Sequence, residues 1–179
     1  MQHLRAIAAT LCLGLYATLP ANAATITRQF DFNYASFSGG APTDPVSGSV
    51  TVVWDNSVGG VNQTTGITLN SLNIPFGFTI GFDYQLMTDT MLIGGYGVGN
   101  DVDSKIAGTD DFFLSILNAS TTAVGDEFSY TSVLTDAHHT AASGSVVTVD
   151  SIPEPASLSL LGIGLAGAAL ARRRYRGIA

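Results

Sequence analysis

The sequence predicts an all-β domain, an antiparallel β-sandwich of jelly-roll-like or immunoglobulin-like type, flanked by an N-terminal signal helix and a C-terminal transmembrane helix. Two observations carry this prediction. Between residues 24 and 151, short runs alternate apolar and polar side chains with a period of two, as in strands with one buried face. Turns rich in glycine, asparagine and aspartate separate these runs at roughly ten-residue spacing, and no window of about eleven residues shows helical periodicity.

The first 23 residues have the parts of a secretory signal peptide. After one arginine, residues 6–19 are apolar, Pro20 ends the helix, and Ala21 and Ala23 frame an A-x-A cleavage site. The alternative is an uncleaved N-terminal anchor, for which the apolar stretch is short. Cys12 is the only cysteine and lies inside this segment, so we expect no disulfide and no cysteine metal site in the mature protein.

The first two strands of the central domain are each expected to bury one face. Residues 26–34 place aromatic side chains on one side and polar ones on the other. Residues 49–54 place two valines and a tryptophan on one side. Residues 38–45 between them are rich in glycine, proline and aspartate, which predicts a loop.

Among the later strands expected from the sequence, one stands out. Residues 112–117 are apolar almost throughout, which predicts a strand buried on both faces. Residues 94–99 hold so many glycines that we expect a loop or a bulged edge. The segments 47–52 and 143–148 both begin Ser-Gly-Ser-Val, which we interpret as a chance likeness between valine-rich strands rather than a duplication. The later strands are expected at residues 67–72, 76–84, 86–93, 112–117, 128–134 and 146–149.

Charge is divided sharply along the chain, whose formal net charge is −7. Thirteen of its fourteen acidic residues lie between residues 24 and 151, where Arg28 and Lys105 are the only arginine and lysine. Binding of nucleic acid or anionic lipid requires a basic footprint, which this domain lacks. We therefore expect no nucleic-acid partner, and a surface that is solvated or meets divalent cations.

One acidic stretch is a candidate calcium site. Ca²⁺ takes several oxygen ligands, and alternating carboxylates in a glycine-flanked loop can supply them. Asp101 and Asp103 alternate in this way, and Asp110 and Asp111 could return from across the loop. The spacing departs from the EF-hand loop, since Lys105 occupies the place of a third ligand. The alternative is a solvated acidic loop with Asx turns, without a cofactor.

Other candidate residues have structural explanations. His138 and His139 would point to opposite faces of a strand, so they cannot easily share one ion, and we expect them in a surface loop. Motifs of nucleophilic hydrolases, zinc proteases and nucleotide-binding proteins are missing from the sequence, so we expect no enzyme. Four aromatic side chains could stack on sugar rings if exposed, or else belong to the core. They are Tyr34, Trp54, Tyr84 and Tyr96.

The C-terminal residues 152–179 begin with a stiff step and an apolar run. Pro153, Glu154 and Pro155 favour an extended backbone that a protease could bind. Residues 156–171 are uncharged and mostly apolar, and as a helix they would be about 24 Å long, somewhat shorter than the ~30 Å hydrocarbon core of a bilayer. Snorkelling of flanking side chains and local thinning can close this gap, so we expect a transmembrane helix.

An arginine cluster completes the tail. Arg172, Arg173 and Arg174 would stop transfer and hold this end in the cytoplasm. The order of Pro-Glu-Pro, apolar helix and arginine cluster closely resembles the bacterial PEP-CTERM sorting signal, with Ile152 in place of the usual valine. The same segment has also been labelled an ice-binding-protein C-terminal domain, a label that describes only the tail.

The resemblance implies a protein that crosses the inner membrane and is anchored there as a precursor, with its domain outside. A membrane-embedded exosortase would then recognise the Pro-Glu-Pro motif and release the protein to the cell surface or the medium. Proteins of this kind are associated with exopolysaccharide and biofilm. The expected organisation is a signal peptide (1–23), an acidic domain (24–151) and a sorting signal (152–179).

Three functions are compatible with this organisation. The first is a structural or adhesive component of the exopolysaccharide matrix, without enzymatic activity. The second is a carbohydrate-binding module that acts on matrix polysaccharide. The third is a hydrolase of that polysaccharide, which would need a cleft with paired carboxylates.

Overall fold

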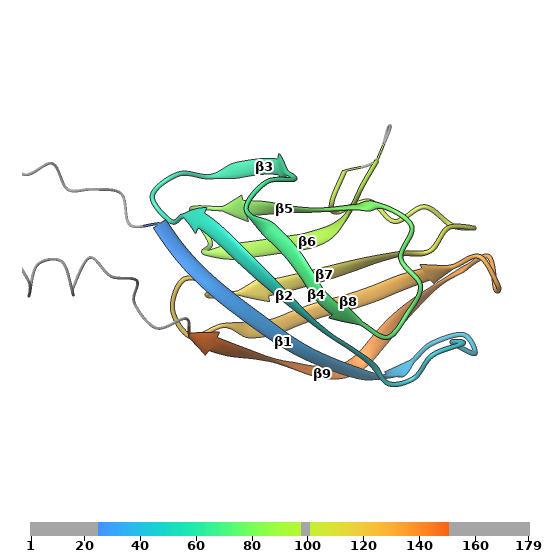
Figure 1. The fold of residues 1–179 in the computed structure, drawn as a ribbon. Helices are drawn as coiled ribbons and strands as arrows, with labels where there is room; N and C mark the ends of the chain where they lie inside the picture. Colours follow the sequence, from blue (N-terminus) through green and yellow to red (C-terminus); the bar gives the residue numbers. More distant parts are fainter. Residues whose placement is uncertain (1–24, 98–100, 151–179) are drawn as a thin grey trace, which may run out of the picture.

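The central domain forms nine strands in the computed structural model, which describes residues 25–97 and 101–150 (Figure 1). Eight of them overlap the strands expected from the sequence, and the short strand at Gly60–Gln63 was not predicted. The predicted signal peptide, sorting signal and transmembrane helix lie outside these residues. Within the described ranges, no helix is long and apolar enough to cross a membrane. The strands are β1 (Thr25–Phe37), β2 (Val46–Asp55), β3 (Gly60–Gln63), β4 (Ile67–Leu72), β5 (Thr79–Gln85), β6 (Thr90–Tyr96), β7 (Asp111–Leu117), β8 (Val124–Ser132) and β9 (Ala137–Asp150).

The strands pair in one antiparallel sheet with the order β3-β5-β6-β7-β8-β9-β1-β2-β4. The sheet bends so that β1, β2 and β4 cross in front of β6, β7 and β8 in Figure 1. Its two ends come near each other, since β4 also contacts β5. Among the described strands, no ladder joins β4 to β3 or β5, so the sheet is nearly closed.

The all-β antiparallel class is therefore confirmed, whereas a sandwich of two separate sheets is not. The reason lies in β9, which is 14 residues long. Its first part pairs with β8, from Ser132↔Ala137 to Ser129↔Thr140. Its second part pairs with β1, from Ala141 to Asp150. The strand β9 thus lies between two halves of the sheet, one formed by β3 and β5 to β8 and the other by β1, β2 and β4. A strand of this length pairs with both halves and joins them into one continuous sheet.

Aromatic side chains fill the space between the two halves. The ring of Phe32 on β1 lies 6.4 Å from Phe112 on β7 and 5.5 Å from Phe128 on β8. Trp54 on β2 lies 5.9 Å from Tyr84 on β5. These contacts confirm the apolar faces expected for the first two strands. β7 is buried at every position except its last, as expected for a strand covered on both faces.

The two Ser-Gly-Ser-Val segments lie on either side of β1, and each places its glycine opposite an aromatic residue. Gly48 on β2 pairs with Phe32, and Gly144 on β9 pairs with Tyr34. A Cβ atom on Gly48 would lie 3.0 Å from Cε1 of Phe32, and one on Gly144 would lie 2.5 Å from Cε1 of Tyr34. Each aromatic ring thus lies over a neighbouring glycine, and the same packing requirement accounts for the similarity of the two segments.

The glycine-rich segment expected as a loop or bulged edge is partly a central strand. Gly94 and Gly95 belong to β6, which lies between β5 and β7. A Cβ atom on Gly94 would lie 2.8 Å from the Phe112 carbonyl oxygen, and one on Gly95 would lie 2.9 Å from Cγ of Asp111. Glycine is needed here because another part of the chain comes too close for a side chain. The strand was expected to begin at residue 86, but residues 86–89 form the turn before it.

Candidate functional site

The residues of the predicted sorting signal, Pro153, Glu154 and Pro155 with the arginine cluster, lie outside the described residues, as does the predicted signal cleavage site. What the structure describes is the point from which the tail leaves. β9 ends at Asp150, three positions before Pro153.

Two of the four aspartates predicted as calcium ligands accept hydrogen bonds from backbone amides. The Asp110 carboxyl accepts from the amide of Val133 at 3.1 Å. The Asp111 carboxyl is buried and accepts from the amides of Gly95 at 3.0 Å and Phe112 at 2.8 Å. Asp111 therefore holds the end of the β6–β7 ladder, whose last pair joins Gly94 to Phe113.

The other two aspartates lie in a polar cluster around Asn62. The side-chain amide of Asn62 donates a hydrogen bond to Asp101 at 2.7 Å and accepts one from the backbone amide of Val102 at 3.2 Å. The backbone amide of Asn62 donates to the carboxylate of Asp83. Burial raises the pKa of Asp83, and the nearby carboxylates of Asp103 and Asp101 raise it further, against the lowering effect of the bond from Asn62. In the part of the chain that the structure describes, no three histidine, cysteine, aspartate or glutamate side chains are grouped so that they could hold a metal ion. The calcium site stays a prediction from the sequence.

The two histidines belong to β9 and not to a surface loop. Strand alternation exposes His138 and buries His139 completely. Nε2 of His139 lies 2.8 Å from Oγ1 of Thr135, and Nδ1 lies 3.0 Å from the carbonyl oxygen of Ser38. The ring also packs against Tyr130, with centroids 5.1 Å apart. His139 thus links the start of β9 to the loop between β1 and β2, with both ring nitrogens satisfied.

Three of the four aromatic side chains considered for sugar stacking belong to the core. Tyr34, Trp54 and Tyr84 are buried because each occupies an inward position of its strand. Tyr96, at the end of β6, is 37% exposed. The ring faces of the buried three contact protein side chains, so they are not available to stack on a sugar.

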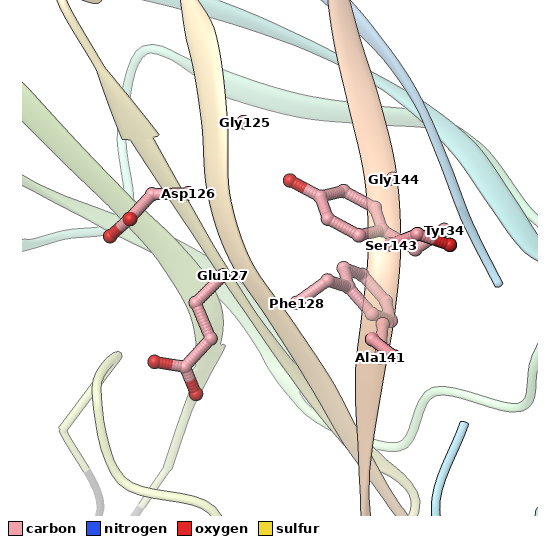
Figure 2. Close-up of a pocket in the computed structure, with 9 residues that line it drawn as sticks. Tyr34, Gly125, Asp126, Glu127, Phe128, Ala141, Ser143 and Gly144 are labelled. Carbon is pink, nitrogen blue, oxygen red and sulfur yellow. The ribbon is translucent and has the colours of Figure 1, made fainter. Parts of the chain in front are cut away.

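A hollow of about 270 Å³ opens where β8 and β9 separate (Figure 2). The ladder between the two strands reaches only as far as Ser129↔Thr140. Beyond this pair, residues 125–128 follow β7 and residues 141–144 follow β1. The hollow is therefore lined by the facing edges of two strands that are each paired on the other side. No local pattern in the sequence indicates this hollow, because it depends on which strands become neighbours.

Tyr34 reaches across this hollow from β1. Its ring stacks on Phe128, with centroids 5.1 Å apart, and Figure 2 shows its hydroxyl pointing toward Gly125. A Cβ atom on Gly125 would collide with this hydroxyl and would lie 3.0 Å from Cγ2 of Val146. The hydroxyl is buried and has no hydrogen-bond partner among the described residues. Glycine at position 125 leaves the room that Tyr34 needs.

Burial raises the pKa of Tyr34 to about 12, and the carboxylate of Asp126 adds to the effect. The phenol is therefore neutral at physiological pH and can act as a hydrogen-bond donor but not as a base. Asp126 and Glu127 point away from the gap in Figure 2, and Asp126 accepts a hydrogen bond from Ser115 at 3.1 Å. This arrangement is compatible with two roles of Tyr34. It can pack the neighbouring strands together, or its hydroxyl can bind a small polar molecule in the hollow.

Replacing Tyr34 with phenylalanine distinguishes these two roles. We expect the free energy of unfolding at neutral pH to stay unchanged or to rise by about 1 kcal/mol, because a buried hydroxyl without a partner loses its bonds to water on folding. Urea unfolding measures this change. A clear loss of stability would instead indicate that a water molecule or a ligand in the hollow bonds to the hydroxyl.

The same pair of proteins should differ in alkaline solution. In the unfolded chain a tyrosine ionises at about pH 10, whereas Tyr34 in the folded protein does so at about pH 12. Ionisation of Tyr34 leaves the free energy of unfolding unchanged below the lower value, and this free energy falls as the pH rises toward the higher one, because the unfolded state ionises first. The wild type should therefore lose more stability than the phenylalanine variant in this range.

Comparison with known families identifies the C-terminal segment. Residues 151–174 match the model of the PEP-CTERM protein-sorting motif. This class of protein is secreted, made as a membrane-anchored precursor and processed by an exosortase to the cell surface. The chain thus carries a PEP-CTERM sorting motif, which confirms the resemblance seen in its sequence. No curated protein and no solved structure matches the chain.

Proposed function

We propose that the chain is a structural or adhesive component of the exopolysaccharide matrix, without enzymatic activity, that an exosortase delivers to the cell surface. The PEP-CTERM motif at residues 151–174 carries this proposal. In the precursor, the apolar residues 156–171 span the inner membrane, the domain of residues 24–151 lies outside, and the arginine cluster stays in the cytoplasm. Cleavage near Pro153 to Pro155 then frees the domain.

The course of the chain through the sheet supports this topology. β1 and β9 are antiparallel neighbours, and in their register Arg28, near the start of β1, lies opposite Asp150, at the end of β9. Both ends of the domain therefore lie at the same pole of the molecule (at the left in Figure 1). A domain tethered at this pole presents its opposite pole to the exterior.

The outer face of β1, β2 and β4 supports a role in contact with hydrated polysaccharide. Gln29 and Ser49 donate to the Asp31 carboxylate at 2.8 Å and 2.7 Å, and Asn70 donates to the Thr51 hydroxyl at 2.9 Å. Asn70 also donates to the Ser49 hydroxyl at 3.3 Å, so these half-buried or exposed side chains form a continuous polar network on a sheet face. Hydroxyl and amide groups held in place can exchange hydrogen bonds with sugar hydroxyls, directly or through water. The same face favours the second candidate, a carbohydrate-binding module, in which polar contacts would replace aromatic stacking.

Changing Pro153, Glu154 and Pro155 together to alanine tests the sorting step. In a host with an exosortase, we expect the variant to accumulate as a full-length chain in the membrane fraction, because the stiff extended step that the protease binds is gone. The wild type should yield a shorter, released chain. Mass spectrometry of both fractions gives the ends of each product.

Two controls make this result specific. Changing the exposed Pro42 to alanine removes a proline outside the motif and should leave processing unchanged. The wild-type chain in a host without an exosortase should behave like the triple-alanine variant. Release of the triple-alanine variant at the wild-type rate would contradict exosortase sorting.

A further inference from the structure

Strand direction gathers three loops and both ends of the domain at one end of the molecule, which we name the tail pole. It is formed by residues 56–59, 86–89 and 118–123, together with the start of β1 and the end of β9. In Figure 1 this is the side toward which β2, β5, β7 and β9 point. The tail pole is therefore the part of the domain nearest to the C-terminal tail.

The loops of the tail pole form one continuous surface. A Cβ atom on Gly59 would lie 3.8 Å from Cβ of Leu86, so the first loop lies beside the second. Ser120 donates from its amide at 3.0 Å and from its hydroxyl at 2.8 Å to Asp89, which joins the second loop to the third. Arg28 donates to the carbonyl oxygens of Ala119 at 2.9 Å and Thr121 at 2.6 Å, which joins the third loop to β1.

This surface exposes a group of apolar side chains. Met87 is 95% exposed at the tip of its turn. Isolated exposed apolar residues are common, but several on adjoining loops indicate an interaction surface. The carboxylates of these loops are turned to local partners, as Asp55 accepts from Ser57 at 2.6 Å and Asp89 from Tyr84 at 2.9 Å. The exposed apolar residues in the tail pole or directly next to its loops are Val58, Leu86, Met87, Leu117, Val124 and Val149.

The length of the tail determines what this surface meets. Only residues 151–155 separate the end of β9 from the apolar segment 156–171. Five residues span at most about 18 Å when fully extended. While that segment lies in the membrane, the tail pole is therefore confined to a thin layer at the bilayer surface. Apolar side chains on a surface held there can enter the boundary between headgroups and acyl chains.

We propose that in the membrane-anchored precursor, on which this inference rests, the tail pole docks on the lipid surface through Met87, Leu86 and Val58. Docking fixes the orientation of the domain and keeps the Pro-Glu-Pro step at the membrane surface, where an embedded protease works. The domain is acidic, so the contact depends on apolar insertion and needs no anionic lipid. After cleavage the tether is lost, and the few side chains of the tail pole no longer suffice to hold the domain.

The depth of single labelled positions tests this docking in the full-length chain. Cys12 is changed to serine, and one cysteine is introduced by Met87→Cys or, as the matched control, by Leu134→Cys. Leu134 is 78% exposed and lies between β8 and β9, at the opposite pole. Each protein is placed in phosphatidylcholine vesicles, labelled with a small fluorophore, and quenched by lipids with nitroxide groups on their acyl chains.

We expect lipid-borne quenching at position 87 to be at least about threefold stronger than at position 134, since only the first is held at the headgroup boundary. Equal and weak quenching at both positions would overturn the docking. Flotation of the same vesicles reports separately whether the chain is anchored, so a failure of anchoring is distinguishable from a failure of docking. Quenching at position 87 that disappears when the protein is diluted in lipid would assign the surface to a second copy of the chain and would also overturn the proposal.

Discussion

Replacing Asp111 with alanine is expected to lower the free energy of unfolding by about 2–4 kcal/mol, because two backbone amides lose their acceptor inside the sheet. The Asp111 carboxyl accepts from Gly95 and Phe112, and its side chain is buried. Water cannot easily replace it, since β6 and β7 are both covered there. Urea unfolding followed by the fluorescence of Trp54, the only tryptophan, measures the change.

Two further variants separate the hydrogen bonds from the general effect of removing an acid. Asp111→Asn keeps one carbonyl acceptor in the same place and should cost less than the alanine variant. Asp110→Ala removes the neighbouring carboxylate, which accepts one amide at an exposed site, and should cost less than about 1 kcal/mol. Similar losses for Asp110→Ala and Asp111→Ala would contradict the role assigned to Asp111.

Replacing Gly144 with alanine is expected to lower the free energy of unfolding by about 1–3 kcal/mol through overpacking. The added methyl group would lie within 2.5 Å of the Tyr34 ring. The ring cannot move aside freely, because it is stacked on Phe128 and its hydroxyl abuts Gly125. The strands β1, β8 and β9 must therefore move apart or shift around Tyr34. Urea unfolding of the variant, read from Trp54 as before, measures the loss.

Gly77→Ala is the matched control for this substitution. The nearest atom to a Cβ there is the Asp110 carbonyl oxygen at 3.8 Å, an ordinary contact. We expect no loss, or a gain of about 0.4–1 kcal/mol from the lower entropy of the unfolded chain. Combining Gly144→Ala with Tyr34→Leu should cost less than the sum of the two single changes, since the smaller side chain removes the collision. Strict additivity would show that Tyr34 is not the source of the strain.

Much of the fold follows from local pattern. The alternation in residues 26–34 and 49–54 predicted which side chains are buried, and the apolar run 112–117 predicted a strand covered on both faces. Such patterns are reliable because every second side chain of a strand faces the same side. The tail was predictable for a similar reason, since the sorting motif consists of consecutive residues.

The predictions from the sequence were wrong where segments that lie far apart in the chain pack against each other. Gly94 and Gly95 resembled a loop, yet they belong to a central strand because Asp111 and Phe112 come too close to allow a side chain. His138 and His139 resembled a polar loop, yet they open a 14-residue strand. A propensity computed along the chain does not include the atoms that pack against it from another strand.

The sequence by itself determined the strand periodicity, the acidic character of the domain and the sorting motif at its end, because each is a property of neighbouring residues. Only the tertiary structure decided that β9 joins both halves into one nearly closed sheet, that Tyr34 reaches across the gap between β8 and β9, and that loops with exposed apolar side chains lie beside the exit of the tail. Strand order and register fix these features, and both depend on contacts between residues that lie more than a hundred positions apart in the chain.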